Sequence, residues 1–156
     1  MPQRQDIALM AHLMRRAGFS ASPEDLDRLV ETAERIASDL APPSVVIYNA
    51  VSGILEGGGA SKFLETDPGR LERNFRVNTT SLLYLARATA PAMIEAGKGA
   101  IIVTGNTSSL RGKPNFAYFA PTKAAQRILA EAMARDLGPK GIHVAYLLID
   151  ASIDTP

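Results

Sequence analysis

The stretch Ala-Ile-Ile-Val-Thr at residues 100–104 decides the fold, because it is a short apolar run without alternation that leads into a polar loop. Such a run is typical of a parallel strand that is covered on both faces. Two similar runs lie at 44–50 and 142–149, and helical patterns separate the three. The alternation of strand and helix predicts an α/β fold with a parallel sheet and helices on both faces.

Capping residues and apolar stripes indicate the helices between these runs. Ser22 can cap free backbone amides and Pro23 suits a first helical turn, so a helix is expected to begin there. Glycines at 57–59 predict a loop. No internal repeat or boundary is visible, so we expect a single domain over 1–156. Helices are expected over residues 4–17, 23–41, 67–96 (kinked at Pro91) and 121–137.

The composition argues against several classes of protein. The 156 residues carry 17 basic and 16 acidic side chains, and this balance argues against a nucleic-acid or membrane-surface protein. The absence of cysteine excludes a disulfide framework and favours a reducing, cytoplasmic location. Neither a signal-peptide core nor a bilayer-spanning run of about 20 residues is present. His12 and His143 are isolated, so no metal site is expected.

Small and polar residues follow each of the three apolar runs, at 49–53, 105–109 and 150–153. In an open parallel sheet, ligands bind outside the carboxyl ends of the strands. These segments therefore predict a binding crevice, although the same composition occurs in ordinary strand-ending loops.

Five segments occur in an order and at spacings that identify a family. They are Tyr48-Asn49-Ala50, Phe75-Arg76-Val77-Asn78, Ile102-Val103-Thr104-Gly105, Phe119-Ala120-Pro121-Thr122-Lys123-Ala124-Ala125 and the turn at 137–144. Together they resemble the central and C-terminal part of a short-chain dehydrogenase/reductase, over roughly residues 24–156. The resemblance implies a Rossmann-like sheet, of which only about three strands are readable here.

This resemblance implies hydride transfer between NAD or NADP and a small-molecule alcohol or carbonyl. In the family a tyrosine transfers the proton, a lysine lowers the pKa of that tyrosine, a serine orients the carbonyl and an asparagine holds a water. Asn78 and Lys123 match the asparagine and the lysine, whereas Phe119 stands at the tyrosine position and Asn106 at the serine position. The implied cofactor-binding residues are Asn49, Ala50, Lys123 and Ile153.

Phe119 removes the general acid, because a phenyl ring has no ionisable proton. The neighbouring Tyr118 is five residues before Lys123, and helical positions five apart point about 140° away from each other. Tyr118 can replace the missing phenol only if the helix begins after Phe119, and Pro121 allows such a start. Asn106 can still donate a hydrogen bond to a carbonyl, and Thr107 or Ser108 can reach in from the same loop.

Structural roles for the same residues remain open. Phe119 is expected to pack in the core, and Lys123 can be an ordinary surface lysine. Asn78 can instead satisfy backbone groups where its helix is interrupted.

The family's nucleotide-binding motif, Thr-Gly-x-x-x-Gly-x-Gly, is absent. Thr104-Gly105 begins like it, but Ser109 and Arg111 occupy the later glycine positions. The first strand–turn–helix unit, which places a pyrophosphate at a helix N-terminus, is therefore missing from the readable pattern. Neither the substrate nor the choice between NAD and NADP follows from the sequence.

Three functions remain compatible with the sequence. The first is an oxidoreductase of the short-chain type, as a fragment of a longer enzyme or as a reduced descendant, and another is a small-ligand binder without turnover. The third is a non-catalytic domain that forms a homodimer or higher oligomer through the helices at 67–96 and 121–137. The side chains expected on that surface are Leu82, Leu85, Ala86, Met93, Ile128, Leu129 and Met133.

Overall fold

A computed structural model describes residues 23–52 and 62–150. The expected helix at 4–17, the glycine loop at 57–59 and the cofactor residue Ile153 lie outside these ranges. Within them, the chain forms a parallel sheet of three strands in the order β1-β2-β3. The strands are β1 (Val45–Tyr48), β2 (Gly99–Gly105) and β3 (Ile142–Leu148). The predicted parallel α/β sheet is confirmed.

The long helices begin and end close to the predicted positions. The first, α2, spans Pro23–Asp39, and α5 spans Ala120–Leu137. The helix expected over 67–96 is divided into α3 (Pro68–Phe75) and α4 (Ser81–Glu95). A π-helical turn, Arg76–Thr80, joins these two, and α4 continues through Pro91. The irregularity in this helix therefore lies at the turn that contains Asn78.

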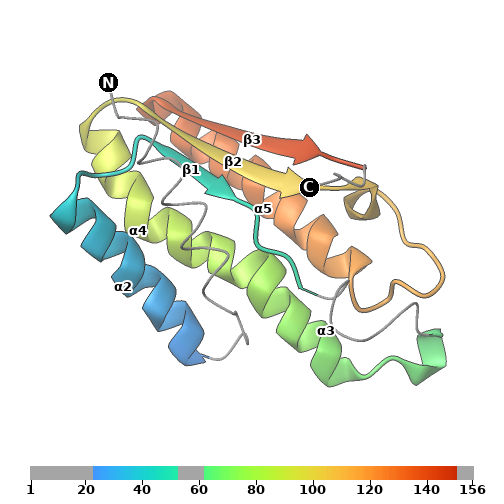
Figure 1. The fold of residues 1–156 in the computed structure, drawn as a ribbon. Coiled ribbons are helices and arrows are strands. Elements are labelled where there is room, and N and C mark those ends of the chain that lie inside the picture. Colours follow the sequence, from blue (N-terminus) through green and yellow to red (C-terminus); the bar gives the residue numbers. More distant parts are fainter. Residues whose placement is uncertain (1–22, 53–61, 151–156) are drawn as a thin grey trace, which may run out of the picture.

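The three long helices lie on one side of the sheet (Figure 1). Alternate residues of β2 point toward them: Ile101 and Val103 are fully buried, and a Cβ at Gly99 would meet Met93 of α4. Tyr146 of β3, paired with Val103, reaches α5. The residues of the core cluster on this side include Leu29, Val46, Tyr48, Leu82, Leu85, Met93, Met133 and Ile142.

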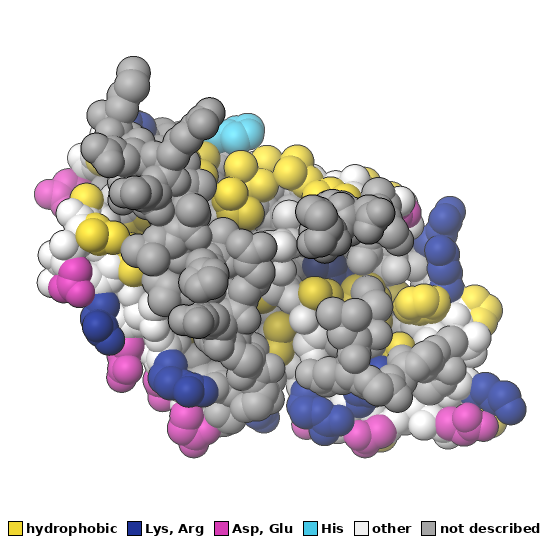
Figure 2. Space-filling view, in the orientation of Figure 1, with side chains coloured by type: hydrophobic (Ala, Val, Ile, Leu, Met, Phe, Trp, Pro, Cys, Tyr) yellow, Lys and Arg dark blue, Asp and Glu magenta, His cyan; other side chains and the backbone are white. Residues whose placement is uncertain are grey.

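The other side of the sheet carries exposed apolar side chains. Among the described residues, the long helices lie on one face. Val45, Ile47 and Leu147 point away from these helices and are 42, 45 and 44% exposed. Figure 2 shows hydrophobic side chains in the region of the strands. An apolar run indicates that a strand can be covered on both faces, without indicating which part of the chain covers them.

The expected association surface also needs correction. Five of its seven side chains, Leu82, Leu85, Ala86, Met93 and Met133, are buried inside this chain. Only Ile128 is strongly exposed, and Leu129 packs partly against the core. The apolar spacing that suggested a contact with a second subunit therefore marks the side of α4 and α5 that faces the sheet.

Gly141 is required where α5 and its 3₁₀ extension turn into β3. It has a φ of 86°, and a Cβ there would lie 2.3 Å from the carbonyl oxygen of Gly97. Gly138, three residues earlier, has a φ of −54°, and a Cβ there would meet no atom within 4 Å. The turn therefore requires glycine at position 141 and does not require it at position 138.

We expect Gly141→Ala to lower the free energy of unfolding by about 2 kcal/mol or more, through left-handed strain and the clash with Gly97. The control Gly138→Ala should change it by less than about 1 kcal/mol. Urea unfolding measures both, and equal effects of the two substitutions would contradict this account of the turn.

Candidate functional site

The carboxyl ends of the strands bring polar side chains together, as the sequence predicted. Asn49 follows β1, Asn106 follows β2 and Asp150 follows β3. The Thr104 hydroxyl at the end of β2 lies 2.6 Å from Asn49 Oδ1 and 3.2 Å from the Tyr48 carbonyl. Ala50 packs partly against the core. The expected crevice residues of β1 and β2 are therefore neighbours.

Asn106 shapes the loop after β2. Its Oδ1 accepts a hydrogen bond from Ser108 N at 3.1 Å, which caps the short 3₁₀ turn Thr107–Ser109. This bond fixes the orientation of the Asn106 amide. Its oxygen is used within the turn, and its nitrogen, Nδ2, is a donor that the turn does not use. The turn is also tied to the end of β3, because Thr107 donates to Asp150 from its backbone amide, at 3.0 Å, and from its hydroxyl. These two bonds, the hydroxyl first, lower the pKa of Asp150.

Asn78 is fully buried in the π-helical turn and uses both ends of its side chain. Its Oδ1 accepts from Ser52 N at 2.9 Å, and its Nδ2 donates to Ser52 O at 3.1 Å. The same Nδ2 lies 2.8 Å from the Thr122 hydroxyl of α5. Asn78 thus satisfies the backbone groups of Ser52, in the loop after β1, from the turn where its own helix is interrupted.

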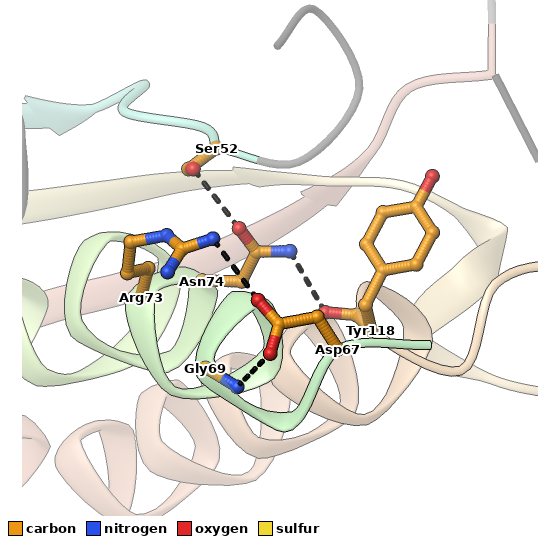
Figure 3. A network of polar contacts seen from close by, with 6 residues as sticks. All are labelled: Ser52, Asp67, Gly69, Arg73, Asn74 and Tyr118. Atoms are coloured by element: carbon orange, nitrogen blue, oxygen red, sulfur yellow. Dashed lines mark hydrogen bonds and ion pairs between the residues drawn. The ribbon is translucent and has the colours of Figure 1, made fainter. Parts of the chain in front are cut away.

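Asn74, one turn before Asn78, is a site residue that the sequence reasoning missed. It is fully buried, and Figure 3 shows it between Ser52 and Tyr118. Its Oδ1 accepts from the Ser52 hydroxyl at 3.0 Å, and its Nδ2 donates to the Tyr118 carbonyl at 2.8 Å. The signal available in the sequence was the pair of asparagines four residues apart, which places both amides on one face of the helix.

Asp67 fixes the start of the helix that carries Asn74. Its Oδ1 accepts from Gly69 N at 2.9 Å as a cap, and its Oδ2 lies 3.5 Å from Arg73 Nη2 (Figure 3). Capping of this kind stabilises a helix start by about 1 kcal/mol. The cap therefore helps to place the following turn, from which Asn74 extends.

Lys123 is buried rather than on the surface. Its side chain is 2% exposed, and Nζ donates to the Thr104 carbonyl at 3.1 Å and to Gln126 Oε1. Burial lowers the pKa of Lys123 from 10.5 to about 8. An amine held at the end of β2, with a pKa near neutrality, is suited to hydrogen bonding and to proton exchange at physiological pH.

The helix α5 begins at Ala120, after Phe119, so the helical spacing between Tyr118 and Lys123 does not apply to Tyr118. Phe119 and Tyr118 nevertheless have different surroundings. Phe119 is fully buried at the start of α5, where its carbonyl accepts from Lys123 N at 3.2 Å. The ring of Tyr118 instead lies 3.8 Å from the guanidinium of Arg70 on α3. Tyr118 therefore packs on α3, whereas the Lys123 ammonium contacts β2 and Gln126.

The sequence predicted neither a metal site nor a membrane-spanning helix. Within 23–52 and 62–150, no cluster of three or more histidine, aspartate or glutamate side chains is arranged to hold a metal ion. No helix in those ranges has both the length and the apolar character needed to cross a bilayer.

Comparison with known proteins finds one family. A family model described as short chain dehydrogenase matches residues 10–153. The chain is 30% identical over 115 residues to carbonyl reductase [NADPH] 2 of Sus scrofa, covering 73% of this chain and 45% of that protein. It is 29% identical over 154 residues to L-xylulose reductase of Homo sapiens, covering 88% and 61%.

Solved structures show the same fold. A short-chain dehydrogenase from Rhodopseudomonas palustris superposes with a TM-score of 0.72 at 33% identity, covering 81% of this chain and 57% of that one. An alcohol dehydrogenase from Comamonas testosteroni, specific for bulky-bulky ketones, gives 0.68 at 26% identity, covering 83% and 48%. The chain spans between 37 and 62% of the length of the first curated relatives.

The pKa of Lys123 makes stability depend on pH. Between about 8 and 10.5 the unfolded chain binds more protons than the folded chain, so the free energy of unfolding should rise with pH, by up to about 3 kcal/mol. Lys123→Met should lack this rise. Urea unfolding at several pH values measures it, and the difference between the two proteins removes the opposite contributions of Tyr48 and Tyr146, whose pKa values are raised by burial. If the free energy of unfolding depends on pH in the same way in both proteins, the rise does not come from the lowered pKa of Lys123.

Proposed function

Since the chain belongs to the short-chain dehydrogenase family, we propose that it forms the lysine-bearing part of an oxidoreductase site for alcohols or carbonyls. The names of its relatives, a carbonyl reductase and an L-xylulose reductase, support a small alcohol or carbonyl substrate and a nicotinamide cofactor. The observation that carries the proposal is that Phe119, which caps α5, and Lys123 in its first turn are both buried, with Lys123 Nζ at the end of β2.

The residues present fit one part of a nicotinamide cofactor. An ammonium has three N–H donors, and Lys123 uses two of them within the chain, so one donor of this nearly buried group remains for a ribose hydroxyl. Asn49 and Asn106 add amides at the same edge of the sheet. No glycine-rich motif for the pyrophosphate is present in the sequence. The fit is therefore limited to the nicotinamide-ribose end, where the cofactor would accept or donate a hydride.

Phe119 determines what this site can do with a proton. The buried ring has no group that can donate to a carbonyl oxygen, and the ring of Tyr118 packs against Arg70 instead. Asn106 Nδ2 can orient a carbonyl, but a carboxamide does not ionise near neutral pH. We therefore propose that this chain binds cofactor and substrate with little or no turnover.

A second candidate is a non-catalytic association domain. Exposed apolar side chains on α4 and α5, namely Leu83, Ile94 and Ile128, favour it. This surface differs from the one expected from the sequence, because it uses the outward side of the two helices. Nicotinamide binding separates the two candidates, since an association domain needs none.

The test compares the chain with Phe119→Tyr, Phe119→Tyr/Lys123→Met and the control Phe116→Tyr. Phe116 is half-buried and its ring centroid lies 6.5 Å from that of Phe119, so the control adds the same phenol nearby but outside the four-residue spacing to Lys123. NADH and NADPH binding is followed by nicotinamide fluorescence, and carbonyl reduction is followed over a substrate panel.

We expect saturable binding by the unmodified chain, and reduction at least about 100-fold faster in Phe119→Tyr, the range that a general acid contributes. Phe116→Tyr should gain nothing, and Lys123→Met should abolish the gain. Absence of saturable binding in every variant would overturn the proposal and favour the association domain.

A further inference from the structure

We infer that Gln126 is a positioning residue, whose side-chain amide holds the Lys123 ammonium at the end of β2 and ties it to the π-helical turn. Gln126 lies three residues after Lys123 on the same face of α5, and its side chain is fully buried. The inference rests on the proposed function only for the use of Lys123 toward a cofactor. The contacts themselves belong to the chain alone.

The amide of Gln126 has only one orientation that fits its neighbours. Its Oε1 accepts a hydrogen bond from Lys123 Nζ, and its Nε2 donates to the Asn78 carbonyl at 2.5 Å. An ammonium can only donate and a backbone carbonyl can only accept. A rotated amide would place its NH₂ against the ammonium and its oxygen against the carbonyl. The two contacts therefore fix the Gln126 amide, and the amide in turn fixes Lys123.

The Asn78 carbonyl belongs to a turn whose carbonyls receive several side-chain donors. The preceding carbonyl, of Val77, accepts from the Ser81 hydroxyl at 2.7 Å and from the Tyr48 hydroxyl. A π-helical turn departs from the regular i to i−4 pattern, and buried carbonyls there need other partners. Gln126 supplies one from α5, so a single amide connects Lys123 to the segment that also carries Asn78.

The groups that face Lys123 act through dipoles rather than charges. No ion pair found among the described residues includes Lys123. Tyr146 of β3 lies 3.5 Å from Gln126 Oε1, and Tyr48 of β1 contacts the turn; burial raises the pKa of both, so both are neutral at pH 7. Arg127, the next residue on α5, pairs with Glu131. The acceptors that hold the ammonium are therefore the Thr104 carbonyl and Gln126 Oε1.

Removing one of these two acceptors should make the charged form of Lys123 less stable relative to the neutral form. Gln126→Met keeps the length of the side chain and removes both hydrogen bonds. The variant should therefore lower the pKa of Lys123 below its value of about 8, by about one unit. A matched control is Thr89→Val on α4, which also removes a buried hydrogen bond, from the Thr89 hydroxyl to the Leu85 carbonyl. It should lower stability without moving the pKa of Lys123.

The experiment is an NMR titration of Lys123 Nζ in chains labelled with ¹⁵N-lysine, without cofactor. A lowered pKa in Gln126→Met and an unchanged pKa in Thr89→Val would support the inference, and the same pKa in all three proteins would overturn it. If Gln126→Met does not fold, exchange of the Gln126 side-chain amide protons in the unmodified chain decides instead. Strong protection supports the bridge, and exchange at the rate of a free amide overturns it. Because no cofactor is used, failed nicotinamide binding would count against the proposed function alone.

Discussion

The two hydrogen bonds between the Asn78 side chain and the backbone of Ser52 are the interaction on which the rest of the site depends. They join the π-helical turn to the loop after β1, across 26 residues of sequence, and both partners are buried. A buried backbone group left without a partner costs about 1–3 kcal/mol, so the turn and the loop can hardly separate while the core stays packed. The end of β1 is thereby held against the π-helical turn.

Hydrogen bonds from the same helix also hold the segment around Phe119 and Lys123, which carries the resemblance to the family. Asn78 also reaches Thr122, and Asn74 holds the Tyr118 carbonyl, so both sides of Phe119 are tied to the helix α3 and its continuation. Lys123 then lies over the end of β2 with Gln126 beside it. This network is intact although the phenol of the family is missing at position 119. The network therefore holds Lys123 in place without a phenol at position 119.

The sequence was sufficient to predict the helices and strands, but it was not sufficient to predict the hydrogen bonds between buried polar side chains. Apolar runs such as 100–104 and the capping residues around Pro23 act locally, so they predict strands and helices well. The late start of α5, at Ala120, was also foreseen from Pro121, but the contact of Tyr118 with Arg70 was not. The spacing of Asn74 from Asn78 and of Gln126 from Lys123 placed each pair on one helix face, but their contacts with Tyr118 and Asn78, 44 and 48 residues away, left no local pattern. For the same reason the apolar stripe of α4 did not show whether it faces the sheet or a second subunit.

The central claim is that Asn78 clamps the Ser52 backbone in the folded chain, and native-state hydrogen exchange of the Ser52 amide tests it most directly. Because Ser52 N donates to a fully buried acceptor, we expect this proton to exchange only through opening of the core, with protection close to that of Val103 in β2. Exchange of the Ser52 proton at the rate of an unprotected loop amide, while Val103 remains protected, would contradict the account.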